Sequence, residues 1–442
     1  MSEHRKIFHV LISAYACEPH KGSEPGVGWN IAKEMAKHCK VWVLTRANNQ
    51  ESIDQEIDAN PIENIHFVFY DLPIFFLKLK RGQIGLQLYY YFWQIGSYFV
   101  ARKLHQSVKF DLAHHVTFVK YWAPSLMALL PIPFLWGPVG GGESTPKPFT
   151  QEFSRYGQIY ERFRDWAKWF SEKDPLVRLT AQRSRISLST TPETAQCLTR
   201  LGASRVEILT QCGIGKTELE NFAHSDRLTQ NNIIFLSIGN LLHLKGFHLS
   251  LKAFKMTKLK QAEYWIIGDG PERHRLQDLV HTLDITRQVH FLGRLSHRDT
   301  LSKINSCDIL LHPSLHESGG GVCVEAMAAG IPVICLDEGG PGSLVTPAVG
   351  IKIPILHPHQ VIKDMSEAMV DLVQFPEHRL RLGQQGKEYV TRQLTWEKKG
   401  HLIFHYYCQM TDSHLRPYSQ LTSPSHASNS FPCNQYLSHL NR

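Results

Sequence analysis

The chain has 442 residues, of which 43% are hydrophobic and 20% are charged. This composition excludes a mostly disordered or fibrous chain and, at ~150 residues per domain, indicates two or three globular domains. The 48 Lys and Arg residues exceed the 40 Asp and Glu residues, which gives a formal net charge of +8. An excess of this size favours an anionic ligand or a membrane surface, and we expect no nucleic-acid partner.

The first half of the chain alternates short apolar runs with helix-length amphipathic stretches. Buried parallel strands have continuous apolar sequences, and strands that alternate with helices form parallel α/β sheets. We therefore predict a parallel α/β domain over residues 1–212. Its expected strands are residues 7–16, 41–45, 65–70, 111–118, 134–139, 186–190 and 206–210.

The loop at residues 22–30 follows the first of these strands and is expected to open a helix. Backbone amides at the start of a helix bind anions, and glycine lets a phosphate approach the backbone closely. Gly26 and Gly28 are therefore candidate residues for binding the phosphates of a ligand.

Residues 83–100 are the strongest candidate for a membrane segment, although they include three glutamines and are only about one span long. We leave three interpretations open: a transmembrane helix, a helix at a lipid interface or over an acceptor cleft, and an aromatic-rich packed helix.

A second aromatic stretch lies between residues 153 and 170, with basic residues among its aromatic ones. Helical spacing places its aromatic residues on one face. That face either packs on the core or forms a surface for lipid-linked or anionic acceptors. The residues are Phe153, Tyr156, Tyr160, Phe163, Trp166 and Phe170.

A polar break over residues 213–232 is the predicted hinge, and a second α/β series follows it over residues 233–395. A helix is expected over residues 396–411, and the Ser- and Pro-rich residues 412–442 are expected to be disordered. The strands of the second series are expected at residues 233–239, 262–270, 289–293, 308–314 and 331–337.

The most informative segment begins with the expected strand at 308–314, which leads into a glycine-rich turn and then a helix that starts near Gly321. The free amides of that helix would face an anion, helped by the helix dipole. Glu317 precedes the turn and Glu325 lies about one turn into the helix, so both could accept hydrogen bonds from a hydroxyl-rich ligand. The alternative is that Glu317 caps the helix and Glu325 is solvated.

These two glutamates lie within the pattern H-P-S-x-x-E…E-A-M-A-A-G-x-P-V-I, which resembles the hallmark of retaining GT-B glycosyltransferases of family 4. The stretch from Gly239 to Gly246 is similar to the G-R-L-x-x-x-K-G motif of that family. The resemblance covers about residues 7–410 and is stronger in the second half. It implies two facing Rossmann-like domains and sugar transfer from a nucleotide-sugar with retention of anomeric configuration, without a protein-bound metal or other cofactor.

The resemblance also assigns roles to individual residues. Glu325 matches the glutamate that holds the ribose hydroxyls, and Glu317 matches the one that touches the donor sugar. Lys245 matches the lysine on the diphosphate. The loop whose amides approach the sugar and phosphate is matched by Gly319, Gly320 and Gly321.

Two departures from the family pattern stand out. Asn240 occupies the position of the usual arginine, which removes one positive charge from the phosphate site. The family's E-G-F-G has become Glu317-Ser-Gly-Gly, so the aromatic residue that shapes the sugar pocket is absent. We include Asn240, Gly268 and Arg294 among the predicted substrate-binding residues.

The family often places a histidine after the fourth strand, where this chain has His114 and His115. Side chains alternate along a strand, so we expect at most one of the two to reach the cleft as a catalytic residue. The other histidines show no zinc-binding spacing, and we predict no metal site.

The predicted partners are a UDP- or GDP-sugar donor and a glycan or lipid-linked acceptor. We expect a cytoplasmic protein, because its cysteines form no Cys-x-x-Cys pair and residues 1–6 lead directly into an apolar strand. Contact with the inner face of a membrane stays open. Two other functions also stay open: a nucleotide-sugar 2-epimerase on the same fold, and a degenerate nucleotide-sugar binding protein.

Overall fold

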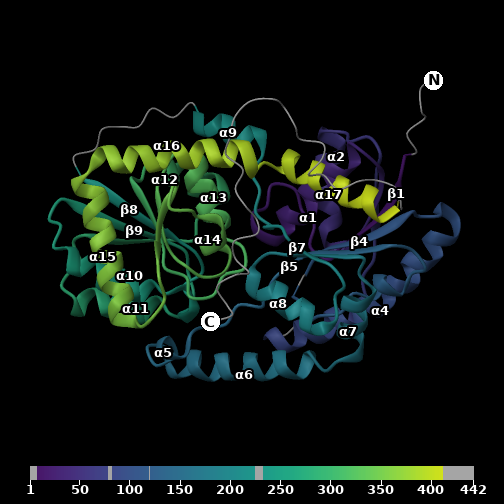
Figure 1. The fold of residues 1–442 in the computed structure, drawn as a ribbon, viewed down its shortest axis with the longest axis horizontal. Coiled ribbons are helices and arrows are strands. Elements are labelled where there is room, and N and C mark those ends of the chain that lie inside the picture. The colour runs from purple at the N-terminus through teal and green to yellow at the C-terminus, as the bar shows by residue number, and fades with distance from the viewer. Residues whose placement is uncertain (1–6, 78–81, 119, 224–231, 412–442) are drawn as a thin grey trace, which may run out of the picture.

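The computed structural model describes residues 7–77, 82–118, 120–223 and 232–411, which form two α/β domains side by side (Figure 1). Each domain is built on one parallel sheet. The first has the strand order β3-β2-β1-β4-β5-β6-β7 and the second has the order β10-β9-β8-β11-β12-β13. Both sheets therefore reverse their direction of growth once, between β1 and β4 and between β8 and β11, and such switch points are where open α/β sheets bind ligands.

Every strand expected from the sequence occurs, and β13 was missed. The strands of the first sheet are β1 (His9–Ala14), β2 (Lys40–Thr45), β3 (Ile65–Phe69), β4 (Leu112–Thr117), β5 (Phe134–Val139), β6 (Ile186–Ser189) and β7 (Val206–Ile208). Those of the second are β8 (Ile233–Ile238), β9 (Ala262–Ile267), β10 (Val289–Gly293), β11 (Ile309–His312), β12 (Val333–Leu336) and β13 (Gly350–Ile353).

Helices cover both faces of each sheet, as the apolar strands require. Those before the second sheet are α1 (Ser23–Ala36), α2 (Gln50–Ala59), α3 (Ile74–Leu77), α4 (Gly82–Val108), α5 (Lys147–Thr150), α6 (Arg155–Ser171), α7 (Pro175–Arg183), α8 (Pro192–Leu201) and α9 (Lys216–Ala223). The others are α10 (Phe247–Thr257), α11 (Arg273–Thr282), α12 (His297–Asn305), α13 (Gly321–Ala328), α14 (Gly339–Leu344), α15 (Pro358–Gln374), α16 (Pro376–Gln393) and α17 (Trp396–Thr411).

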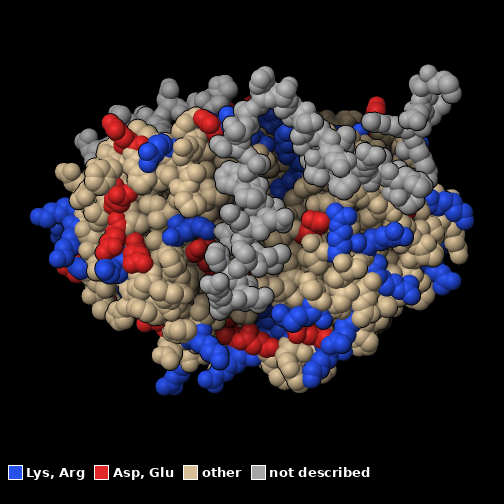
Figure 2. Space-filling view, viewed as in Figure 1, with Lys and Arg blue, Asp and Glu red and all other residues tan. Residues whose placement is uncertain are grey.

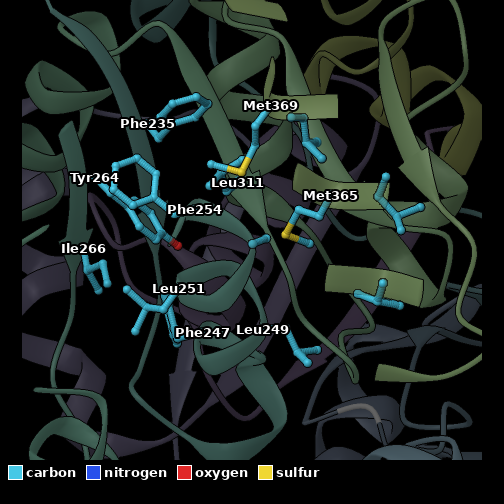
Figure 3. Packing of buried hydrophobic residues seen from close by; sticks show 14 of the residues in the cluster. Phe235, Phe247, Leu249, Leu251, Phe254, Tyr264, Ile266, Leu311, Met365 and Met369 are labelled. Carbon is cyan, nitrogen blue, oxygen red and sulfur yellow. The ribbon is translucent and has the colours of Figure 1, made fainter. Parts of the chain in front are cut away.

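One of the two hydrophobic clusters of the second domain lies between its sheet and helices α10 and α15 (Figure 3). Phe235 and Tyr264 from the strands pack against Phe254 of α10 and against Met365 and Met369 of α15. These side chains are almost fully buried, and each contributes roughly 1.5–3 kcal/mol of transfer free energy. This packing gives β8 and β11 a rigid base, and the loops at their carboxyl ends carry the residues described below.

Two segments cross over between the domains: each belongs to one half of the sequence but packs on the domain formed by the other half. Helix α17 follows the second domain but lies beside α1 of the first (Figure 1). Its Tyr407 is fully buried and shares a 2.7 Å hydrogen bond with His114 of β4. In the other direction, Phe149 and Phe153 of the first half join the core of the second domain. The two domains are thus connected by more than the hinge.

Charges of both signs are interspersed over the face drawn in Figure 2. In the part of the chain that the structure describes, no helix combines the length and the apolar character needed to cross a bilayer. For residues 83–100, which lie in α4, this finding disfavours the transmembrane interpretation and leaves the other two.

Candidate functional site

Lys245 and Glu317 lie at the switch point of the second sheet. Lys245 ends the short 3-10 helix that follows β8, and Glu317 lies in the loop that follows β11. Because β8 and β11 are neighbouring parallel strands, their carboxyl ends bring these two residues together. The Lys245 ammonium forms an ion pair with the Glu317 carboxylate, and each side chain is about one-fifth exposed.

The environment of Glu317 keeps its carboxylate charged. Burial alone would raise the pKa of this carboxyl group, but the Lys245 ammonium and the nearby His312 ring hold that pKa well below its usual range. The His312 Nε2 atom lies 3.8 Å from the carboxylate, and the ring is 5% exposed. The alternative that Glu317 caps the helix is wrong, because it pairs with Lys245 instead.

The glycine-rich turn joins the loop to α13. Gly320 has a φ of +95°, a left-handed conformation that favours glycine, and α13 begins at the next residue. A Cβ atom on Gly319 would lie 2.8 Å from the side-chain nitrogen of Gln211, which comes from the segment joining the domains. The turn is therefore tightly packed and presents the first amides of α13 beside Glu317.

Glu325 lies on α13 and shares a 3.0 Å hydrogen bond with His297, the first residue of α12. This interaction raises the pKa of His297 above its ordinary value. The carboxylate is partly buried and already held in place. It is therefore an oriented acceptor on the same helix as the glycine turn, and not a freely solvated surface group.

The predicted histidines do not reach an open cleft. His114 is fully buried between Tyr407 and the carbonyl oxygen of Gly137, each 2.7 Å away. His115 is buried as well, with Tyr90 and Ser13 as its hydrogen-bond partners at 3.1 Å. Burial lowers the pKa of His114 to about 4 and that of His115 to about 3. We expected at most one of the two to reach the cleft, and the structure encloses both, because helices cover both faces of their strand.

Gly26 and Gly28 lie inside α1 and not in a loop before it. A Cβ atom on Gly26 would come within 2.1 Å of the Lys21 carbonyl oxygen, and one on Gly28 within 2.2 Å of the Ala16 carbonyl oxygen. Both glycines are therefore needed for the helix to pack closely against the segment after β1. Close packing therefore accounts for glycine at both positions, and no phosphate-binding role is needed to explain them.

The remaining predicted residues surround the switch point. Asn240 follows β8, and its side chain is exposed. Gly268 follows β9 and has a φ of +138°, and a Cβ atom there would meet the Gly239 carbonyl oxygen at 1.9 Å. Arg294 follows β10 and is exposed. All three thus lie at the carboxyl ends of strands, on the same edge as Lys245.

Sequence reasoning missed Glu143, which connects the two domains. It follows β5 of the first domain and is fully buried. Its carboxylate accepts hydrogen bonds from Thr191 and Thr194 of its own domain, at 2.6 Å and 3.1 Å, and from Ser318 of the second domain at 2.6 Å. Ser318 directly follows Glu317, so Glu143 fixes the position of the Glu317 loop. The sequence feature that could have pointed to Glu143 is the Gly-Gly-Gly-Glu stretch directly after β5, where ligand-binding loops of parallel sheets lie.

A cavity of about 890 Å³ opens between the domains next to this connection. One wall consists of residues of α4 and α6, and a second contains Lys120 and Trp122 from the segment after β4. The end of the cavity at the second domain is formed by Leu244, His316 and Ser318, which are the sequence neighbours of Lys245 and Glu317. The volume is suited to a small-molecule ligand.

A comparison with protein families shows which known proteins the second domain resembles. Residues 220–389 match the family model described as Glycosyl transferases group 1. The matched region contains Lys245, Glu317 and Glu325. The switch-point residues therefore lie in the part of the chain that resembles group 1 glycosyltransferases.

Two curated relatives match over part of the chain. One is a GDP-mannose-dependent monoacylated alpha-(1-6)-phosphatidylinositol monomannoside mannosyltransferase of Corynebacterium glutamicum, which is 32% identical over 37% of this chain and 43% of its own length. The other is a 2-deoxystreptamine N-acetyl-D-glucosaminyltransferase of Niallia circulans, which is 29% identical over 30% of this chain and 33% of its own length. The chain thus spans less than half the length of each of these relatives.

Solved structures extend the likeness to both domains. A sucrose-phosphate synthase from Thermosynechococcus elongatus superposes with a TM-score of 0.60 at 18% identity, covering 91% of this chain and 98% of that one. Anabaena HepE in complex with UDP and glucose superposes with a TM-score of 0.58 at 15% identity, covering 91% and 100%. At these identities the likeness establishes the fold, which is the GT-B arrangement of two Rossmann-like domains.

Proposed function

We propose that the chain transfers a sugar from a UDP- or GDP-sugar to a hydroxyl group of a glycan, glycolipid or lipid-linked acceptor, with retention of anomeric configuration. The observation that carries the proposal is the Lys245–Glu317 ion pair at the carboxyl ends of β8 and β11, beside the glycine turn and Glu325. The proteins named above support a nucleotide-sugar donor, because they include a GDP-mannose-dependent mannosyltransferase and a protein with bound UDP and glucose.

In this proposal the donor diphosphate lies at the start of α13. The Gly319–Gly321 amides and the Lys245 ammonium stabilise the negative charge that develops on the leaving group, which is the largest single catalytic contribution in many enzymes. Because Lys245 pairs with Glu317 in the ligand-free protein, donor binding replaces a carboxylate partner by a phosphate partner. Glu317 is then released to accept a hydrogen bond from the donor sugar.

The ribose part of the donor lies farther along α13 in this proposal. Glu325 accepts hydrogen bonds from the two ribose hydroxyls, and His297 keeps its carboxylate oriented. Asn240 and Arg294 lie at the same edge of the sheet. With Asn240 in place of arginine, Lys245 and the helix amides carry more of the diphosphate charge.

The acceptor enters from the first domain through the cavity beside Ser318, and closure of the domains around the donor limits hydrolysis. Incubation of the protein with labelled UDP- and GDP-sugars tests the proposal. Transfer, or slow hydrolysis without an acceptor, supports it. An epimerised sugar would instead identify a 2-epimerase, and binding without turnover would identify a degenerate binding protein.

A further inference from the structure

Helix α6 has its amphipathic faces reversed relative to a normal surface helix. Its buried face is polar: Glu161 pairs with Arg164 at 2.8 Å, and Lys168 donates a 2.7 Å hydrogen bond to the Glu143 carbonyl oxygen. Its outer face carries large apolar side chains beside the exposed Arg155, Arg162 and Asp165. Of the predicted aromatic stripe, only Phe153, which precedes the helix, lies in a hydrophobic core, and Tyr160 is half-buried. The exposed large apolar residues are Tyr156, Ile159, Phe163, Trp166, Trp169 and Phe170, at 47–67% exposure.

Helix α4 exposes a similar stripe. Leu88, Phe92, Ile95 and Phe99 are 38–60% exposed and recur at steps of four, three and four residues, which places them on one face. The opposite face is buried through Tyr89, Tyr90 and Trp93. Contiguous exposed apolar surface of this kind marks an interaction site in a soluble protein.

The two stripes meet at the cavity described above. Leu88 of α4 and Phe163 and Trp166 of α6 are exposed to solvent and also line the cavity, so they form its mouth. The opposite end reaches Ser318, which is adjacent to Glu317 in the sequence. An apolar path therefore leads from the molecular surface to the residues that we assign to the donor sugar.

Three cations, Lys120, Arg164 and Lys168, line the cavity, together with the carboxylates of Glu24 and Asp174. Arg164 pairs with Glu161, and Lys168 donates to the Glu143 carbonyl oxygen. The Lys120 ammonium sits 4.8 Å from the centre of the Trp122 ring and 5.7 Å from that of Phe118. Among the residues that the structure describes, Lys120 forms no ion pair. Burial lowers the pKa of the Lys120 ammonium, while the aromatic rings and the nearby Glu24 carboxylate favour its charged form. An anionic ligand beside Lys120 would favour the charged form further.

We propose that this cavity binds an amphiphilic acceptor in which a phosphate or diphosphate joins a long apolar chain to the acceptor sugar. This inference rests on the proposed function and names the substrate class of its acceptor. The apolar chain lies between α4 and α6, the phosphate faces Lys120, and the sugar hydroxyl points toward Ser318 and Glu317. A free glycan would leave the apolar mouth of the cavity without a role.

Calorimetric titration with dodecyl phosphate, below its critical micelle concentration, tests the apolar part of the site without requiring the donor. We expect saturable binding that Trp166→Ala weakens about tenfold, or about 1.4 kcal/mol. The matched control is Trp169→Ala, because Trp169 is 55% exposed on the same helix and does not line the cavity. This control should bind dodecyl phosphate like the unmodified protein.

The substitution Lys120→Gln tests the proposed phosphate-binding part of the site. It should weaken dodecyl phosphate binding and leave the binding of dodecyl maltoside, which has the same chain and an uncharged head, unchanged. The control is Lys173→Gln, because the Lys173 ammonium also lies over a tryptophan ring, 3.5 Å from the centre of Trp169, but outside the cavity. Inorganic phosphate should not compete.

Three results would overturn this inference: no saturable binding of dodecyl phosphate, equal losses in Trp166→Ala and Trp169→Ala, or equal losses in Lys120→Gln and Lys173→Gln. Equal losses of dodecyl phosphate affinity in the two tryptophan variants would mean that the alkyl chain associates with the whole exposed face of α6 and not with the cavity. UDP and GDP affinities measured on the same samples report separately on the donor site and on folding. If the unmodified protein binds dodecyl phosphate as expected but binds neither UDP nor GDP, the result counts against the proposed function and not against this inference.

Discussion

The Lys245–Glu317 ion pair links catalysis to stability at a single position. Lys245→Ala should lower turnover by about 10²–10³-fold, because it removes a charge that stabilises the leaving group. It also leaves the partly buried Glu317 carboxylate with only the His312 ring nearby, which we expect to cost about 1–2 kcal/mol of unfolding free energy after allowance for solvent screening. Turnover of labelled donor and urea unfolding measure the two effects.

The double variant Lys245→Ala/Glu317→Gln separates these effects. The neutral amide does not need an ammonium partner, so stability should recover while turnover stays low. Near-normal turnover in either variant would contradict the assignment of Lys245 to the diphosphate.

The two glutamates should respond differently to substitution. Glu325→Ala should weaken binding of the free nucleoside diphosphate and raise KM more than it lowers kcat, because the ribose does not react. Glu317→Gln should mainly lower kcat. Its affinity for the diphosphate should equal or exceed that of the unmodified protein, since Lys245 loses its carboxylate partner. Calorimetry with UDP and GDP measures this difference, and the opposite pattern would reverse the two assignments.

Glu338 should make the stability of the folded protein depend on pH. It precedes α14, and burial, reinforced by Glu193 and Glu143, raises the pKa of its carboxyl group to about 7. A raised carboxyl pKa means that the folded protein loses stability as the pH rises from the unfolded pKa, near 4.5, through 7. Glu338→Gln should therefore stabilise the protein at pH 8 by about 1–2 kcal/mol.

The stabilisation by Glu338→Gln should shrink steadily between pH 7 and pH 5, where the carboxyl group is protonated in the folded protein. Thermal unfolding across this range provides the measurement. A gain that is independent of pH would show that the raised pKa is not its cause.

At the level of secondary-structure elements, α17 fastens the end of the chain to the first domain. Tyr407→Phe removes the hydroxyl group that bonds His114 Nδ1 and leaves that nitrogen buried without a partner. We expect a loss of about 1–3 kcal/mol in unfolding free energy. Tyr406→Phe on the same helix is the control, since Tyr406 is also buried but its hydroxyl group forms no hydrogen bond among the residues that the structure describes. Equal losses in both variants would argue against a specific role for the His114 bond.

For the whole molecule, the Glu143–Ser318 hydrogen bond favours the closed arrangement of the two domains. Ser318→Ala removes this hydrogen bond, worth about 1.5–3 kcal/mol, and also the one that the Ser318 hydroxyl oxygen accepts from the Gly141 amide of the first domain. Small-angle X-ray scattering without ligand should then give a larger radius of gyration. Ser343→Ala is the control, because its hydroxyl group bonds Gly339 within one domain. An unchanged radius for Ser318→Ala would mean that other contacts hold the domains together.

The sequence by itself was enough to predict the two parallel sheets and the switch-point residues of the second domain. Long apolar runs specify buried strands, because both faces of a parallel sheet are covered. Glu317 and the glycine turn were predicted from their place between the expected strand at 308–314 and the helix that follows it. Lys245 was predicted from the resemblance of the Gly239–Gly246 stretch to the family motif. β13 was missed because its sequence, Gly-Ile-Lys-Ile, is short and has only two apolar side chains.

Only the tertiary structure decided what the side chains face. His114 and His115 have the pattern of cleft residues, but helices from distant parts of the chain, α17 and α4, cover both sides of their strand. The aromatic stripe of α6 has the spacing of a core-facing helix, and yet Glu161 and Lys168 of this helix point inward, toward His243 and Glu143 respectively. Periodicity determines that a helix has two faces. Which face is buried depends on the groups that distant parts of both domains present to it, and local sequence does not contain that information.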